Sequence, residues 1–245
     1  MSEQQEDFAS DYSISIYALS EKALTVVFGQ VISETLWHLV SSFNRLLTQN
    51  PFSGLTTTVP AYSTLTVFFD PLVVASADLP GKTCYEKVSA YLKTISHNEP
   101  GQTGLGGNHI VIPVCYGGDF GPDILTVAQN NGLSETEVIT LHSGASYRVY
   151  MIGFVPGFAY MGGMPQTLAT PRKQVPAAAI PAGSVGIAGL QTGIYPIEIP
   201  GGWQIIGRTP LQLFDATRQQ PALLKGGDSI TFKDITIEEF NAYRV

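Results

Sequence analysis

The sequence has few cysteines and few charged residues, and both shortages narrow the possible classes of protein. Cys84 and Cys115, the two cysteines among 245 residues, are too few for a disulfide-stabilised scaffold. With the four histidines they form neither an HxxxH nor a CxxC pattern, so we expect no metal site. Charged residues make up 13% of the chain and hydrophobic residues 44%, which is typical of a globular protein with a filled core or a partner-covered surface.

A positive surface is also missing. The net charge is −7, and the 13 lysines and arginines are scattered, so the sequence excludes the basic patch that nucleic-acid binding requires. No apolar run approaches the 18 or so residues of a membrane span. The polar, acidic start MSEQQEDF lacks the apolar core of a signal peptide, so we expect a cytoplasmic protein.

The sequence partly matches three functional motifs and completes none of them. Gly81-Lys82-Thr83 resembles the end of a P-loop, but Ser76 stands where its first glycine is required. Ser184 resembles the serine of a nucleophile elbow, but Ala182 breaks the G-x-S-x-G spacing. The GLGG at residues 104–107 does not complete a dinucleotide-binding GxGxxG. The sequence therefore supports neither a Walker ATP site nor a serine hydrolase.

The first hundred residues have the pattern of a small α+β domain. Alternating and helical periodicities predict the element order ββαββα, which we interpret as a two-layer, ferredoxin-like domain covering residues 1–100. The Gly-rich, polar segment HNEPGQTGLGGN at 97–108 indicates the domain boundary. The predicted strands are 13–19, 23–28, 55–59 and 65–69, and the predicted helices are 33–49 and a second one beginning at Thr83.

Residues 101–245 have many short strand patterns and few helices, which predicts a β-barrel domain. Ser134 and Glu137 form the pattern of a capping box at the start of a helix. The predicted strands are 110–114, 147–152, 211–214 and 229–232, and the predicted helices are 122–131, 134–142 and 237–243.

Residues 153–210 stand out as a stretch rich in glycine and proline and nearly free of charge. Such a stretch favours short strands joined by shaped turns, with backbone groups lining a surface. Arg172 and Arg208 lie in this quiet background, where a guanidinium can present its fork to a carboxylate or phosphate. Gln191 adds an amide donor and acceptor. The alternative is a tightly turned core with ordinary surface charges.

His142 has two interpretations. It lies at the end of a predicted helix, where the helix dipole favours a protonated histidine, and it is also a candidate proton shuttle. The aromatic residues Tyr160, Tyr195 and Trp203 form either the walls of a site or ordinary packing. Asp119 and Asp123 make a candidate carboxylate pair, which loop and helix-cap roles explain equally well.

The order of motifs in this stretch resembles the KipI / allophanate hydrolase subunit 1 family, which in bacteria includes the B subunit of 5-oxoprolinase. The resemblance rests on GFVPGFAYMGGMP, TPR, PAGSVGIAGLQTGIYP and PGGWQIIGRTP, and it extends over about residues 12–233. It implies an N-terminal α+β domain followed by a cyclophilin-like β-barrel. Ala177, Ala178 and Ala179 replace a segment that usually carries arginine in the family, which bears on substrate handling.

The resemblance also implies a function. It is that of the B subunit in an ATP-dependent 5-oxoprolinase that converts 5-oxoproline to glutamate, with ATP and Mg as co-substrate and with the A and C subunits as partners. The alternatives are a histidine-kinase inhibitor of the KipI type, a subunit related to allophanate hydrolase and urea amidolyase, and, from architecture alone, a peptidyl-prolyl isomerase. The predicted catalytic residues are His142, Arg172, Gln191 and Arg208, and the predicted substrate-binding residues are Phe154, Pro156, Gly157, Phe158, Tyr160, Tyr195 and Trp203.

Overall fold

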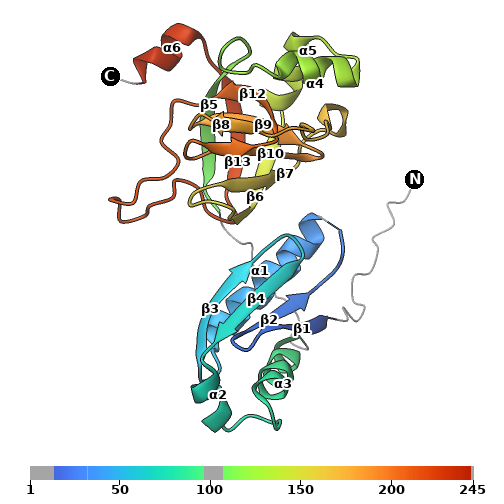
Figure 1. Cartoon of the computed structure of the whole chain (residues 1–245), viewed down its shortest axis with the longest axis vertical. Coiled ribbons are helices and arrows are strands. Elements are labelled where there is room, and N and C mark those ends of the chain that lie inside the picture. Colours follow the sequence, from blue (N-terminus) through green and yellow to red (C-terminus); the bar gives the residue numbers. More distant parts are fainter. Residues whose placement is uncertain (1–13, 32, 97–106, 244–245) are drawn as a thin grey trace, which may run out of the picture. The chain divides into compact units, whose positions relative to one another are not determined.

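The computed structural model describes residues 14–31, 33–96 and 107–243 and separates the chain into two compact units. The units comprise residues 1–105 and 106–245 (Figure 1). Each has its own hydrophobic core. The predicted boundary between residues 100 and 101 lies outside the described residues.

The first unit contains a four-stranded antiparallel sheet with the order β1-β2-β4-β3 (Figure 1). Helices α1 and α3 confirm both predicted helices. They share one core with the strands. The described elements run ββαββαα instead of βαββαβ, so the ferredoxin-like description stays a prediction. The bounds are β1 Ser15–Ser20, β2 Ala23–Val27, α1 Glu34–Gln49, β3 Leu55–Pro60, β4 Thr64–Phe69, α2 Pro71–Ser76 and α3 Cys84–Ser96.

Local capping explains where these helices begin. The Ser33 hydroxyl accepts a hydrogen bond from Leu36 N–H at 3.2 Å, as expected for the start of α1. The short helix α2 was not predicted, although its signal is present. Asp70 caps it by accepting from Leu72 N–H at 2.9 Å, and Pro71 occupies the first turn.

The second unit is built on a closed seven-stranded barrel, which confirms the predicted β-barrel. Its strand order is β10-β7-β6-β13-β5-β12-β9 (Figure 1). Strand β11 pairs with β8 outside the barrel. The bounds are β5 His109–Tyr116, α4 Ile124–Asn131, α5 Glu135–Ser143, β6 Ser146–Ile152, β7 Ala159–Gly162, a 3-10 turn at Gln166–Leu168, β8 Ala177–Ile180, β9 Ser184–Ala188, β10 Gln191–Ile194, β11 Ile199–Gly201, β12 Gln204–Arg208, β13 Ser229–Asp234 and α6 Ile237–Ala242.

Alternation along the strands divides the barrel into an inner and an outer face. Val185 and Ile187 of β9, Ile194 of β10 and Met161 of β7 pack in the main core with Ile206 of β12. Gly186, between Val185 and Ile187 on β9, and Gly193, next to Ile194 on β10, therefore belong to the outer face. The capping box at Ser134 and Glu137 is confirmed and begins α5, which packs against this core through Val138.

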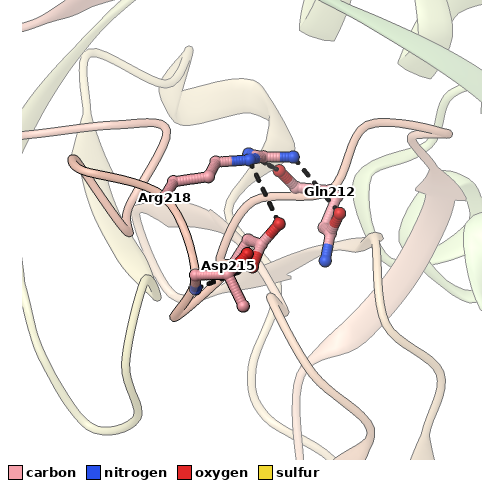
Figure 2. Close-up of polar contacts among 4 residues, drawn as sticks. Gln212, Asp215 and Arg218 are labelled. Carbon is pink, nitrogen blue, oxygen red and sulfur yellow. Dashed lines mark hydrogen bonds and ion pairs between the residues drawn. The ribbon is translucent and has the colours of Figure 1, made fainter.

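The predicted strand at 211–214 is wrong. The segment between β12 and β13 makes only an isolated bridge between Phe214 and Ala222, because its backbone bonds within the segment: Asp215 N–H donates to the Pro221 carbonyl at 2.9 Å, and Leu223 N–H donates to the Leu213 carbonyl at 2.8 Å. Side chains of the same segment also contact one another. Figure 2 shows the contacts: Arg218 Nε lies 3.3 Å from an Asp215 carboxylate oxygen, and Arg218 also donates to the Gln212 carbonyl at 3.2 Å.

The turn at Gly183 generates a testable difference between two glycines. Gly183 has φ +83°, and a Cβ there would overlap the Thr209 carbonyl oxygen. Gly132 has φ +65° with nothing within 4 Å of the same atom. Gly132→Ala should lower the free energy of unfolding by about 1 kcal/mol, from backbone strain alone. Gly183→Ala should cost about 2 kcal/mol more, because the Thr209 backbone must shift.

Urea unfolding followed by circular dichroism measures both variants against the wild type. Equal losses of stability in Gly183→Ala and Gly132→Ala would contradict the close approach at Thr209.

Candidate functional site

The candidate site lies on the outer face of the barrel, at two glycines whose lack of a side chain lets other residues contact the backbone of the sheet. Gly186 of β9 and Gly193 of β10 are paired in register. A Cβ on Gly193 would lie 3.0 Å from Phe158 Cζ and 3.0 Å from Trp203 Cζ3, so the two aromatic rings rest directly on the sheet. A Cβ on Gly186 would lie 3.1 Å from Trp203 Cβ. The glycines therefore determine where the rings pack.

Four aromatic side chains gather on this face, and we call them the aromatic cluster: Phe158, Tyr160, Tyr195 and Trp203. Phe158 is buried at the centre, with ring centroids 4.7 Å from Tyr160, 5.3 Å from Tyr195 and 5.5 Å from Trp203. The pairs with Tyr195 and Trp203 meet edge to face, which is the favoured geometry for aromatic rings. The structure thus brings together four of the predicted substrate-binding residues.

Arg172 joins the cluster from the segment before β8. Its guanidinium carbon lies 5.9 Å from the Trp203 ring centroid, a cation–π distance, while the residue is exposed. Burial raises the pKa of Tyr160, and the nearby Arg172 opposes that rise. Burial raises the pKa of Tyr195 to about 12, opposed by a hydrogen bond from the Trp203 backbone and by Arg172. Both phenols are therefore neutral hydrogen-bonding groups beside an exposed positive charge.

The loop between β6 and β7 carries three further predicted residues. Phe154 has φ +68°, the one positive φ among the non-glycine residues that the structure describes, and its side chain is 63% exposed. Its ring meets Phe158 edge to face at 5.7 Å, so the strained residue extends the aromatic cluster outward. Pro156 is exposed, and Gly157 turns the chain at φ +83°.

Gln191 and Arg208 occupy different surroundings. Gln191 begins β10, is half-buried, and lies on the same face of the strand as Gly193. Arg208 of β12 pairs with Cys115 and Ser184, and its guanidinium lies 5.6 Å from the Phe120 ring. The structure therefore places Arg208 against an aromatic ring outside the aromatic cluster.

His142 lies in the barrel interior, fully buried on α5. Thr192 Oγ1 donates to the Gly186 carbonyl at 3.0 Å, so it must accept from His142 Nε2–H, also at 3.0 Å. The other ring nitrogen, Nδ1, then accepts from Tyr116 Oη at 2.8 Å. Phe232 stacks on the imidazole with centroids 4.5 Å apart.

This environment fixes the charge state of His142. Burial lowers its pKa to about 3, so the ring is neutral at pH 7, and the protonated form expected from the helix dipole is not the one present. Both ring nitrogens are occupied by protein partners. The geometry favours the structural interpretation of His142, and its role as a proton shuttle stays a prediction.

The sequence pointed to Asp123 as a candidate carboxylate but gave no sign of its pairing with Lys173. Lys173 Nζ and Asp123 Oδ2 lie 2.6 Å apart, across 50 positions of sequence. Sequence patterns carry no signal for such a pair, because each residue alone looks like a helix cap or a surface charge. Within residues 14–31, 33–96 and 107–243, the His, Cys, Asp and Glu side chains form no group of three that could hold a metal ion.

The comparisons with known proteins agree with the predicted resemblance. The model of the carboxyltransferase domain, subdomain C and D, matches residues 14–224. The chain is 42% identical to the 5-oxoprolinase B subunit of Bacillus subtilis over 94% of its own length and 96% of that protein. It is 55% identical to the 5-oxoprolinase B subunit of Escherichia coli O157:H7, over 50% of this chain and 56% of that protein.

A solved structure is also similar to this chain. A conserved uncharacterized protein from Pyrococcus horikoshii is 46% identical, with a TM-score of 0.54, over 92% of this chain and all of that one. The second unit is a closed β-barrel that carries the aromatic cluster on its outer face. The chain belongs to the carboxyltransferase subdomain C and D family, together with the bacterial proteins named as the B subunit of 5-oxoprolinase. None of the helices in the described part of the chain is long and apolar enough to cross a membrane.

Burial of His142 predicts a measurable pH dependence of stability. The folded-state pKa is about 3 and the ordinary value is 6.5, so between these values the unfolded chain binds the extra proton. His142 therefore does not affect the pH dependence of the free energy of unfolding above pH 6.5. As the pH falls from 6.5 toward 3, the free energy of unfolding decreases by up to about 1.4 kcal/mol per pH unit. His142→Gln should remove that slope. Urea unfolding at pH 7, 6 and 5 measures it.

The matched control is His109→Gln, which removes an exposed histidine and leaves the interior network intact. This control should keep the wild-type slope. An unchanged slope in His142→Gln would mean that the folded state does not exclude the proton.

Proposed function

We propose that this chain is the B subunit of an ATP-dependent 5-oxoprolinase, which opens the ring of 5-oxoproline to give glutamate. The observation that carries the proposal is the 42% identity with the Bacillus subtilis B subunit along nearly the whole of both chains. Identity of that extent covers both units of this chain, including the segment that builds the aromatic cluster.

The proposed assembly also contains the A and C subunits, and ATP with Mg²⁺ is the co-substrate. Ring opening of the lactam consumes one water, and cleavage of ATP to ADP and phosphate consumes a second. ATP would transfer its terminal phosphoryl group to the lactam carbonyl oxygen and release ADP. One water would then add to the activated carbon and break the ring C–N bond, which leaves an acyl phosphate, and the second water would hydrolyse this to glutamate and phosphate. Because the sequence lacks a Walker pattern, we assign the ATP site to the assembly and not to this chain alone.

Within that reaction, Arg172 is the cation that we assign to the substrate. Transfer of the phosphoryl group places negative charge on the oxygens beside the lactam carbon, and 5-oxoproline also carries a carboxylate. A guanidinium binds either group strongly, and its effect on rate is largest where charge develops in the transition state. Arg172 is exposed and supported by the Trp203 ring, which fits this role. Tyr160 and Gln191 supply neutral hydrogen-bonding groups on the same outer face.

Arg208 remains a second proposed cation. Because it lies over Phe120 and away from the aromatic cluster, its substitution should have a different effect from that of Arg172. A loss of kcat for Arg172→Ala alone assigns the substrate to the aromatic cluster, and a loss for Arg208→Ala alone assigns it to the Phe120 surface.

The test is ATP-dependent glutamate formation from 5-oxoproline by the three subunits. Arg172→Ala should lower kcat about 10²-fold, since it removes a contact made in the transition state, and should leave the unfolding midpoint unchanged because the side chain is exposed. Lys233→Ala, which removes an exposed cation on β13, is the control and should retain full activity.

Two results would contradict the proposed function. One is undiminished activity when this chain is omitted. The other is co-purification of the chain with a histidine kinase in place of the C subunit, which would favour the inhibitor hypothesis.

A further inference from the structure

Lys173, the residue that follows Arg172 in the sequence, forms an ion pair with Asp123. Lys173 Nζ and Asp123 Oδ2 are 2.6 Å apart, and the side chains are only 24% and 16% exposed. A pair this sheltered from water holds its geometry more firmly than a pair at the open surface. Asp123 belongs to the loop before α4, so the contact ties the segment that carries Arg172 to a distant part of the chain.

Asp123 is itself held by β12. The same carboxylate oxygen accepts a hydrogen bond from Ile205 N–H at 2.7 Å, and Asp123 N–H donates to the Ile205 carbonyl at 2.9 Å. Asp123 occupies the N-cap position of α4, yet its side chain makes no capping hydrogen bond. The carboxylate is thus committed to β12 and Lys173 instead of to its own helix.

The backbone on both sides of Arg172 is fixed to the same region. Gln204 Nε2 donates to the Pro171 carbonyl at 3.0 Å. Lys173 N–H donates to the Gly202 carbonyl at 2.7 Å. These two contacts flank Arg172 in sequence, and Trp203 lies between their partners. The Arg172 side chain is therefore directed over the Trp203 ring, while Lys173 is directed to Asp123.

We propose that Asp123 is a positioning residue, which acts through Lys173 to hold the Arg172 guanidinium over Trp203 in the orientation that meets the substrate. This inference rests on the proposed function for its effect on rate. Its structural part, the placement of Arg172, is independent of any reaction. A misplacement of a catalytic group by about 1 Å can cost 10²-fold in rate, so a remote carboxylate can matter strongly.

Asp123→Asn is the informative variant, because the amide oxygen still accepts from Ile205 N–H while the charge that holds Lys173 is lost. Lys173→Met removes the other partner and keeps a long apolar side chain. We expect each to lower kcat at least 10-fold with a smaller change in KM. In an Arg172→Ala background, either substitution should have no further effect on kcat, because the residue being positioned is gone.

A second readout needs no catalysis. The chain has two tryptophans, Trp37 and Trp203, so ¹⁵N NMR of the indole N–H groups gives two signals, and Trp203→Phe identifies which is which. Arg172→Ala should shift the Trp203 signal, because it removes the cation over the ring. Asp123→Asn and Lys173→Met should shift it in the same direction, while the signal of Trp37, which lies in the first unit, stays in place. An unchanged circular dichroism spectrum shows that the second unit remains folded.

The matched control is the more exposed ion pair between Asp215 and Arg218, in which Arg218 is 41% exposed (Figure 2). Asp215→Asn should change neither kcat nor the Trp203 signal. An unmoved Trp203 signal in Asp123→Asn would overturn the positioning role, as would an equal loss of kcat with and without Arg172. If the wild-type assembly forms no glutamate, the proposed function fails, and the NMR comparison still decides the placement of Arg172.

Discussion

The second unit depends on the absence of side chains at two neighbouring positions of its barrel. Gly186 and Gly193 expose backbone on the outer face, and the rings of Phe158 and Trp203 fill the space that a Cβ would occupy. Because the rings pack directly against the sheet, their distance from the sheet is fixed, and they form a rigid surface for Arg172. Arg172 then lies over Trp203 with its charge toward solvent. A change at either glycine would move every group above it.

The barrel separates two polar systems that have opposite character. In the interior, Tyr116, His142 and Thr192 satisfy one another, and the imidazole is held neutral by burial. On the outer face, Arg172 is exposed, and Asp123 and Lys173 hold its segment in place. A closed network of this kind specifies the packing of a core, whereas an exposed and supported cation is available to a ligand. His142 and Arg172, both predicted as catalytic residues, therefore lie in opposite surroundings.

The sequence predicted most of the architecture and only part of the candidate site. Helix caps such as Ser33 and Ser134 and the alternation of strands are local signals, so the elements and the barrel were predictable. The strand predicted at 211–214 was wrong because the backbone of this segment bonds to residues 221–223 of the same loop and not to the barrel. The burial of His142 and the pairing of Asp123 with Lys173 arise from tertiary contacts, which leave no pattern in a single sequence.

The central claim is that the substrate meets this chain at the aromatic cluster, beside Arg172. The direct measurement is ¹⁹F NMR of the assembled enzyme, with 5-fluorotryptophan in this chain, before and after addition of 5-oxoproline without ATP. The account predicts that the Trp203 signal shifts in a saturable manner while the Trp37 signal does not. A Trp203 signal that stays unchanged at substrate concentrations that saturate turnover would contradict it.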